Sequence, residues 1–436
     1  MLRNWFDRLR GESDEEAAAS ESSAPGPAAP AVPAFVARRP LISGRGEIAG
    51  FEFRLNDATQ WQLINLADPA AETAFAVALM GAMRTTMQAG RVAYAALAPD
   101  VLLRPEVTQQ LGPRMMLCIQ PPEVLTTATI ERVDALRMSG ALIGWPGSWL
   151  AAVPRRPRTD FVALQYVGGA IDGLLAAKQQ WVQTIPGVST VASDIASIDD
   201  LELAVRSGVS LASGTIATAR EPRDAKPMAP HMQRISRLLN HVVLDAGNAR
   251  IVEQIRVDVA LSYRLLRYLN SAAFGLTRKI ESIEQAVVLL GRNELYRFLS
   301  MLLIGAAEWR RLSHALQEIA LTRGRMLELL AIERGTDPPD GLFTVGMFSL
   351  LDALFQTPLA QALAPLQLAT PAQQALLEAR GPWRRYLDIA IALERHDFAT
   401  AAQLGEGFGV GGLERIVVLS DDAQEWARQV SLDAVL

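Results

Sequence analysis

Residues 258–303, DVALSYRLLRYLNSAAFGLTRKIESIEQAVVLLGRNELYRFLSMLL, contain the pattern that decides the fold of the C-terminal half. An apolar stripe at helical spacing opens this stretch and consists of Leu261, Leu265, Tyr268 and Leu269. Ser282 and Gln285 have the spacing of a capping box at the start of a second helix, and Gly291 suits the turn that ends it. Because no strand pattern of comparable strength follows residue 230, residues 230–432 are predicted to be all-helical.

The region before this helical half, residues 36–218, alternates short apolar runs with helical stretches. Five runs have the length and composition of strands, namely 47–53, 115–119, 141–145, 160–166 and 188–193. The segments with helical periodicity are 71–88, 123–138, 169–183 and 198–206. Strands that alternate with helices predict an α/β domain with a parallel sheet, either open or closed into a barrel.

Stretches rich in proline and polar residues flank the α/β region. Residues 11–35 are dominated by Ala, Pro, Ser, Glu and Gly, so residues 1–35 are predicted to be a disordered tail, and residues 219–229 a linker. At the start of the tail, LRNWFDRLR (2–10) places Leu2, Trp5, Phe6 and Leu9 at helix-like spacing. This segment is either a short motif that docks on a partner or a membrane surface, or a frayed terminus.

The overall composition excludes several classes of function. The 436-residue chain is 50% hydrophobic and has a formal net charge of −5, which argues against wholesale disorder and against non-specific binding of nucleic acid. The one cysteine, Cys118, excludes an internal disulfide framework and a multi-cysteine zinc site. No apolar run approaches the roughly 18 residues of a membrane span, and the start lacks the pattern of a secretory signal. We therefore expect a cytoplasmic protein with no transmembrane segment.

The stretch quoted first closely resembles the HDOD domain of bacterial signalling proteins, a modified relative of HD-GYP-type domains. The residues that carry the resemblance are Asn270, Ser271, Ala272, Phe274, Gly275, Ile280, Ser282, Ile283, Ala286, Leu290 and Gly291. We interpret these positions as structural, because Asn and Ser side chains bond to the backbone where a helix ends and glycine accepts a positive φ there.

The N-terminal half resembles the EAL domain, whose active members hydrolyse cyclic di-GMP. RRPLISGRGEIAGFEFRL (38–55) looks like the opening strand, loop and second strand of that family, and STVASDIASIDDLELAVRSGVSLASGTIA (189–217) looks like its closing strand, helix and glycine-containing strand. The resemblance implies a TIM-type α/β barrel. An EAL domain followed by an HDOD domain is the order of a class of two-domain bacterial signalling proteins.

The EAL resemblance also implies which positions hold metal in active members. Glu52 keeps the signature glutamate. The other such positions are occupied by Ala95, Cys118, Ile143, Gly144, Ala163, Gln165 and Ser193, and Asp194 stands where the family has a lysine. Hard divalent ions need several oxygen ligands, so these substitutions predict a domain without metal, cofactor or phosphodiesterase activity. Glu52 is then either a vestigial ligand or an ordinary polar residue at a strand end.

The histidines of the helical half support the same interpretation. The HD superfamily, which the HDOD domain resembles, holds its metal with histidines and a His-Asp pair. The histidines of this chain are His231, His241, His314 and His396. The only His-Asp pair, at 396–397, lies far outside the segment where that superfamily keeps its ligands.

These observations predict a pseudoenzyme with no catalytic residue, a signal-transduction scaffold or adaptor that acts through contacts with other signalling proteins. The EAL–HDOD resemblance implies a role in cyclic-di-GMP-linked regulation, such as motility or biofilm formation. Tyr263, Arg264 and Arg267 lie away from the apolar stripe of their helix and form either a docking face or a solvated polar face. The alternatives are a sensor that binds cyclic di-GMP, weakly, without hydrolysis, and a residual metal-dependent phosphohydrolase.

Overall fold

The computed structural model describes residues 36–55, 68–122, 125–167, 169–214, 224, 227–270, 279–307 and 311–432. The predicted tail, 1–35, and most of the predicted linker lie outside the described residues. The described residues divide into two compact units, one formed by 36–214 with 392–399 and the other by 227–391 with 400–432. The domain boundaries predicted at 218 and 230 border this undescribed segment and stay predictions.

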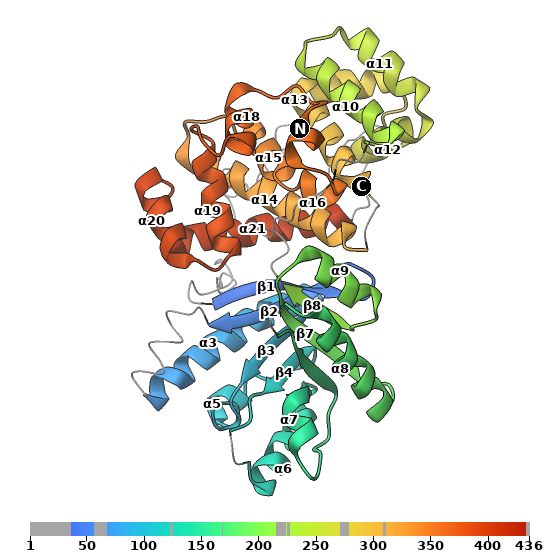
Figure 1. Cartoon of the computed structure of the whole chain (residues 1–436). Coiled ribbons are helices and arrows are strands. Elements are labelled where there is room, and N and C mark those ends of the chain that lie inside the picture. The colour runs from blue at the N-terminus through green and yellow to red at the C-terminus, as the bar shows by residue number, and fades with distance from the viewer. Residues whose placement is uncertain are drawn as a thin grey trace. The chain divides into compact units, whose positions relative to one another are not determined.

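The first unit is built on a closed barrel of eight strands in sequence order (Figure 1). The strands are β1 (Val36–Ser43), β2 (Ile48–Leu55), β3 (Val92–Leu97), β4 (Met115–Ile119), β5 (Leu142–Pro146), β6 (Phe161–Gln165), β7 (Ser189–Ile195) and β8 (Leu211–Gly214). Strand β1 pairs antiparallel with both β2 and β8, and the other neighbours are parallel. The five strands predicted from apolar runs are present, and the open choice between a sheet and a barrel is settled as a barrel.

Helices of 4 to 20 residues lie between the strands of this barrel. They are α3 (Pro69–Gln88), α4 (Pro99–Leu102), α5 (Pro105–Thr108), α6 (Thr127–Ala135), the 3₁₀ turn η1 (Leu136–Ser139), α7 (Gly147–Ala152), α8 (Ile171–Thr184) and α9 (Ile198–Arg206). The side chains of Asp68, Thr126 and Ser197 accept backbone N–H groups at the starts of α3, α6 and α9. The predicted helix 123–138 is shorter than expected because it begins after Thr126 and tightens into η1.

Side chains fill the interior of the barrel. The buried cluster inside it consists of Leu41, Tyr94, Met116, Cys118, Phe161 and Val191. The rings of Tyr94 and Phe161 meet edge to face with centroids 5.9 Å apart. A Cβ on Gly144 would lie 2.3 Å from the Phe161 ring, so glycine at this position leaves the space that the ring occupies. The barrel is therefore a packed core, and chemistry at its surface must come from the strand ends.

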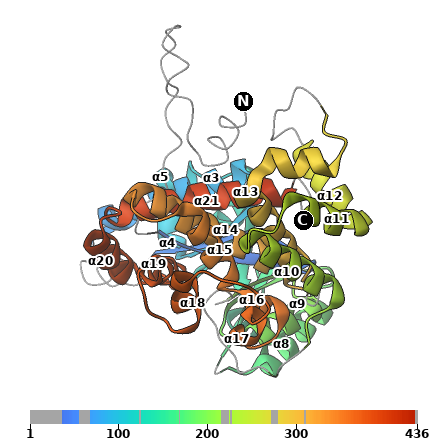
Figure 2. The same ribbon diagram turned by 90° about the horizontal axis from the view of Figure 1, so that it is seen from above.

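The second unit is all-helical in its described residues, as predicted. Its helices are α10 (Pro230–Val243), α11 (Asn248–Val257), α12 (Val259–Leu269), α13 (Ile283–Gly305), α14 (Ser313–Arg334), α15 (Pro339–Phe348), α16 (Leu351–Phe355), α17 (Leu359–Leu363), α18 (Thr370–Leu377), α19 (Arg384–Glu394), α20 (Phe398–Phe408) and α21 (Leu413–Leu432). Helix α14 packs against α15 and α21, which lie beside it in Figure 2. In the described parts of the chain, no helix is both long and apolar enough to cross a membrane.

The HDOD motif residues that the structure describes have structural roles. Ser282 accepts the Gln285 N–H at 3.2 Å and caps α13. Gly291 has φ +68° and ψ −177°, which breaks the helical path inside α13 as a glycine there predicts. Asn270 donates to the Leu266 and Ile280 carbonyls and accepts the Ile280 N–H, each at 2.8 Å, so it ties the end of α12 to the start of the next segment. Ser271, Phe274 and Gly275 lie outside the described residues, so their structural roles stay predictions.

Candidate functional site

Four charged side chains meet at one end of the barrel, where β2 and β7 end. Glu52 pairs in register with Tyr94, and partners in a parallel ladder face the same side, so Glu52 faces the barrel interior. Arg54 follows on the same face two residues later. Because β1 runs antiparallel to β2, Arg39 lies opposite Glu52 and reaches the same end. Asp194, with φ +63°, comes from β7.

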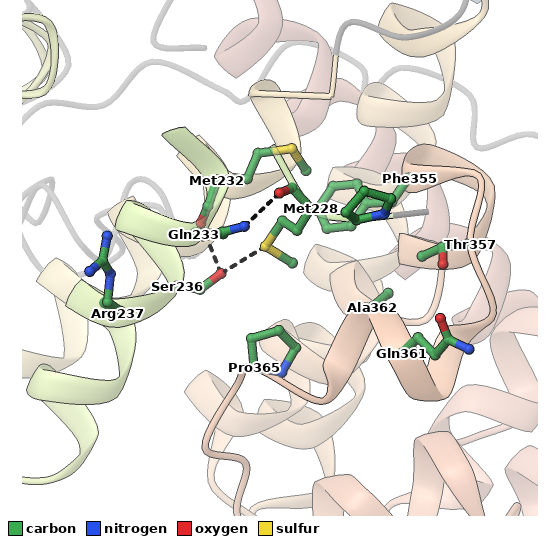
Figure 3. Close-up of a pocket in the computed structure, with 11 residues that line it drawn as sticks. Met228, Met232, Gln233, Ser236, Arg237, Phe355, Thr357, Gln361, Ala362 and Pro365 are labelled. Atoms are coloured by element: carbon green, nitrogen blue, oxygen red, sulfur yellow. Dashed lines mark hydrogen bonds between the residues drawn. The ribbon is translucent and has the colours of Figure 1, made fainter. Parts of the chain in front are cut away.

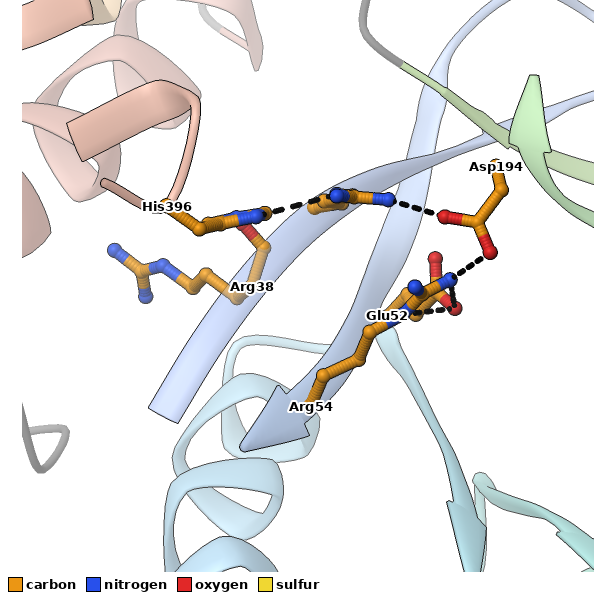
Figure 4. A network of polar contacts seen from close by, with 6 residues as sticks. Arg38, Glu52, Arg54, Asp194 and His396 are labelled. Atoms are coloured by element: carbon orange, nitrogen blue, oxygen red, sulfur yellow. Dashed lines mark hydrogen bonds and ion pairs between the residues drawn. The ribbon is translucent and has the colours of Figure 1, made fainter. Parts of the chain in front are cut away.

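The four side chains form one ion-paired cluster, which we call the strand-end cluster (Figure 4). Arg54 donates to the Glu52 Oε1 atom from Nε at 2.9 Å and from Nη2 at 2.6 Å. The same Nη2 atom lies 2.8 Å from Asp194 Oδ2, and Arg39 Nη1 lies 2.5 Å from Asp194 Oδ1. Glu52 is 3% exposed, so its charge is buried beside the guanidinium of Arg54.

The electrostatics of the strand-end cluster keep Arg54 and Asp194 ionised. Burial alone would lower the pKa of Arg54, but hydrogen bonds and attraction to Asp194 and Glu52 raise it above the usual arginine value. Burial alone would raise the pKa of Asp194, and its bonds to Arg54 and then Arg39 lower it instead. Two arginines and two carboxylates sum to no net charge. The cluster therefore has no excess negative charge to attract a cation.

His396 also contacts this end of the barrel, from the segment 392–399 that belongs to the same unit. Arg39 Nε donates to His396 Nδ1 at 3.2 Å, so the ring proton lies on Nε2, which is 3.1 Å from the Arg38 carbonyl (Figure 4). Both ring nitrogens are thus engaged with Arg38 and Arg39. This geometry gives His396 a positioning role for Arg39.

The positions compared with EAL metal ligands lie on two faces of the barrel wall. By strand alternation and register, Cys118, Gly144, Ala163, Gln165 and Ser193 share the interior face with Glu52. Ala95 and Ile143 are fully buried on the opposite face, because they flank Tyr94 and Gly144 in their strands. The structure therefore places five of these seven positions on the face of the barrel wall that carries Glu52 and two on the opposite face.

The interior side chains offer few metal donors. Burial is the main cause that raises the pKa of the Cys118 thiol to about 12, so the thiol stays protonated at neutral pH. Within the described part of the chain, Ser193 Oγ and the second carboxylate oxygen of Glu52, Oε2, are buried without a hydrogen-bond partner. Throughout the described ranges, no group of three or more His, Cys, Asp or Glu side chains is arranged to hold a metal ion. The residues that surround Glu52 do not fit a pair of divalent ions, since a guanidinium lies between its two carboxylates.

The helical unit holds the predicted docking residues. Tyr263 is 63% exposed on α12 and Arg267 is exposed on the same helix. Arg264 lines a cavity of about 640 Å³ between α10, α12 and the end of α13. The two histidines of α10 point to different partners, His231 to the Ala306 carbonyl and His241 to Gln254. Whether Tyr263, Arg264 and Arg267 form a docking face stays a prediction.

A second cavity in the helical unit, of about 520 Å³, lies between α10 and the α16–α17 region (Figure 3). Met228, Met232, Phe355 and Pro365 give it apolar walls. Two of its polar side chains are bonded within the chain: Gln233 donates to the Met228 carbonyl at 2.7 Å and Ser236 donates to the Met232 carbonyl at 2.9 Å.

Sequence reasoning missed the partners of Glu52. Arg54 and Asp194 are visible in the sequence only as departures from the EAL pattern, and their pairing depends on barrel closure, since they lie 140 residues apart. A buried ionic cluster in the helical unit was missed as well. Arg297 Nη1 lies 2.5 Å from Glu328 Oε1, and Arg325 Nη1 lies 2.9 Å from Glu328 Oε2. A charged residue in the middle of an apolar helical run is the signal that could have indicated it.

Comparison with known protein families matches residues 227–380 to the HDOD domain. The uncharacterized protein YuxH of Bacillus subtilis is 30% identical over 224 residues, which are 50% of this chain and 54% of that protein. The cyclic di-GMP phosphodiesterase CdgJ of Vibrio cholerae is 30% identical over 185 residues, 42% of each chain. The chain thus matches about half or less of the length of these curated relatives.

Solved EAL structures are similar to the N-terminal part. An EAL domain protein from Listeria monocytogenes is 12% identical and aligns with a TM-score of 0.32 over 42% of this chain and 86% of its own. The Xanthomonas citri FimX EAL domain, solved in complex with c-diGMP, is 12% identical and aligns with a TM-score of 0.33 over 51% of this chain and 94% of its own. The assignment of a barrel rests on the closed strand order described above.

Proposed function

We propose that this chain, whose residues 227–380 are an HDOD domain, is a non-catalytic signalling protein that acts through protein–protein contacts in cyclic-di-GMP-linked regulation. In this proposal the barrel is a degenerate EAL-type domain. The single observation that carries it is the Arg54 guanidinium, which bridges the only two carboxylates of the strand-end cluster, Glu52 and Asp194.

The ligands that phosphodiester hydrolysis needs explain why the position of Arg54 matters. Two-metal catalysis needs several oxygen ligands around ions that activate water and stabilise the leaving oxygen. The side chains that share the interior face with Glu52 supply a protonated thiol at Cys118, an amide at Gln165 and a hydroxyl at Ser193. A divalent ion beside Glu52 would have to displace Arg54, whose positive charge already compensates that carboxylate. The arrangement favours a structural ion pair over a metal centre.

The link to cyclic di-GMP rests on the relatives. The Vibrio cholerae protein carries the name of a cyclic di-GMP phosphodiesterase and is 30% identical over 185 residues. That name also makes hydrolysis of cyclic di-GMP the competing function for this chain. The experiment must therefore distinguish a barrel that hydrolyses cyclic di-GMP from one that does not.

A second candidate is a sensor that binds cyclic di-GMP without cleaving it. The observation that favours it is Glu52 Oε2, a buried carboxylate oxygen with no hydrogen-bond partner among the residues that the structure describes. Carboxylate oxygens accept N–H groups well, and a guanine base carries such donors on its edge. In this reading, Glu52 would bind a base rather than a metal.

The test is an assay of the purified full chain with cyclic di-GMP and Mg²⁺ or Mn²⁺, followed by chromatography of the products. We expect no linear product. Metal-dependent product that disappears in Glu52→Ala and persists in the matched control Glu47→Ala would overturn the proposal; product that persists in both indicates a contaminant. Calorimetric titration with cyclic di-GMP then decides the second candidate, because a micromolar isotherm lost in Glu52→Ala would establish a sensor.

A further inference from the structure

The cavity beside Arg264 has an apolar floor and a basic rim. Ile235, Leu261 and Leu302 line the floor, and Arg234 and Arg264 lie on the walls, within a volume of about 640 Å³. A surface of this kind, apolar at the base and charged at the edge, suits a short peptide segment that carries the opposite charge.

The charges of the cavity do not balance. Asp258 is the carboxylate among its lining residues, and it is already used twice: Oδ1 accepts the Leu261 N–H at 3.0 Å, and Oδ2 pairs with Arg234 at 3.4 Å. Within the part of the chain that the structure describes, Arg264 takes part in no ion pair or hydrogen bond. The cavity therefore presents an uncompensated guanidinium over an apolar floor.

We propose that residues 12–16 of this same chain, ESDEE, occupy the Arg264 cavity. This run carries four carboxylates within five residues, namely Glu12, Asp14, Glu15 and Glu16. Its charge complements the unpaired Arg264, and the residues before it include the aromatic pair Trp5 and Phe6, which match an apolar floor. A partner that uses the cavity must then displace the tail.

A long tether joins the acidic run to the start of the barrel. Nineteen residues lie between Glu16 and Val36, where β1 begins. A chain of this length spans at most roughly 70 Å when extended, and it holds its end at an effective concentration of order millimolar. An interaction that is weak between separate molecules is therefore populated within one chain. This inference does not depend on whether the barrel hydrolyses cyclic di-GMP.

Thiol labelling of the full chain tests the proposal. Ala260 is exposed and lines the Arg264 cavity, so Ala260→Cys introduces a reporter thiol there. Gln361 is exposed at the other cavity, and Gln361→Cys is the matched control reporter. The natural Cys118 is buried and contributes no background. Each reporter thiol is labelled with a maleimide in two versions of the chain. One version has the natural tail, and the other has a tail neutralised by E12Q, D14N, E15Q and E16Q.

We expect tail neutralisation to speed labelling at the Ala260→Cys site about fivefold, as for a cavity covered roughly four-fifths of the time. Arg264→Glu should have the same effect with the natural tail, and about 0.5 M NaCl should remove the difference between the tails. The control Arg237→Glu, on the other side of α10, and the Gln361→Cys reporter should show no change. Equal rates with both tails at the Ala260→Cys site, or a change confined to or shared by the Gln361→Cys site, would overturn the proposal.

Discussion

Arg54 holds Glu52 from two positions further along the same strand, with Nε and Nη2 both on the Oε1 atom at 2.9 and 2.6 Å. Residues i and i+2 of a strand face the same side, so this contact follows directly from the extended backbone of β2. The carboxylate that the EAL resemblance singles out is thus compensated by a cation that the same strand supplies.

Removing one partner of the Glu52–Arg54 pair should lower the stability of the fold more than replacing both partners together. Arg54→Met leaves a charged carboxylate that is 3% exposed without its main partner, and we expect a loss of about 2 kcal/mol in the free energy of unfolding, at the low end for buried pairs because Arg54 reaches solvent. The double variant Glu52→Gln/Arg54→Met should recover most of that loss. Urea denaturation of the three proteins measures both effects. A double variant as unstable as the single one would contradict this account of the pair.

A buried ion pair with aromatic neighbours occupies the centre of the helical unit. Glu328 is 1% exposed and binds Arg297 and Arg325, and the Arg297 guanidinium lies 3.7 Å from the centroid of the Phe343 ring. Glu328→Gln keeps the shape but removes the carboxylate that the two buried guanidinium groups share, so we expect a loss of about 3 kcal/mol in the free energy of unfolding. Thermal unfolding followed by circular dichroism measures it. The matched control is Glu333→Gln. Glu333 lies on the same helix as Glu328 and forms a more exposed ion pair with Arg415, so this change should alter the free energy of unfolding by less than about 1 kcal/mol.

The same cluster predicts acid sensitivity. Burial alone would raise the pKa of Glu328, but Arg297 and Arg325 lower it below the ordinary value of 4.5. A carboxyl group whose pKa is lower in the folded state contributes stability above its unfolded pKa and loses it as the pH falls towards the folded pKa. We expect the melting temperature to fall with pH below about 4.5, and the fall to be shallower in Glu328→Gln. Parallel acid limbs in both proteins would assign the acid sensitivity to other carboxyl groups.

How far the sequence alone leads differs between the fold and the site. Periodicity and capping residues predict most helices and five strands because these signals are local. Strand β3 (Val92–Leu97) was not predicted from these signals, because its alanines have little preference for strands. Its pairing with β2 and β4 supplies the stabilisation.

The candidate site is less accessible to sequence reasoning. Glu52 is identified through a family resemblance, whereas Asp194 joins it only because the barrel closes, and Arg39 only because β1 runs antiparallel. Arg297 and Glu328 likewise lie 31 residues apart on different helices. Which charges meet across a fold depends on register and helix packing, and these are not local properties of the sequence.

Cys118 should be almost inert in the folded protein. The thiol is 3% exposed inside the barrel, and burial is the main cause that raises its pKa to about 12, so little thiolate forms at pH 8. We expect a disulfide reagent such as DTNB to label less than about a tenth of the chains within the time that labels an exposed thiol fully, and one thiol per chain in denaturant. The exposed thiol of the Ala260→Cys variant with a neutralised tail is the positive control. Rapid native labelling of the unsubstituted chain would mean that the barrel opens at β4, because no other cysteine is present to react.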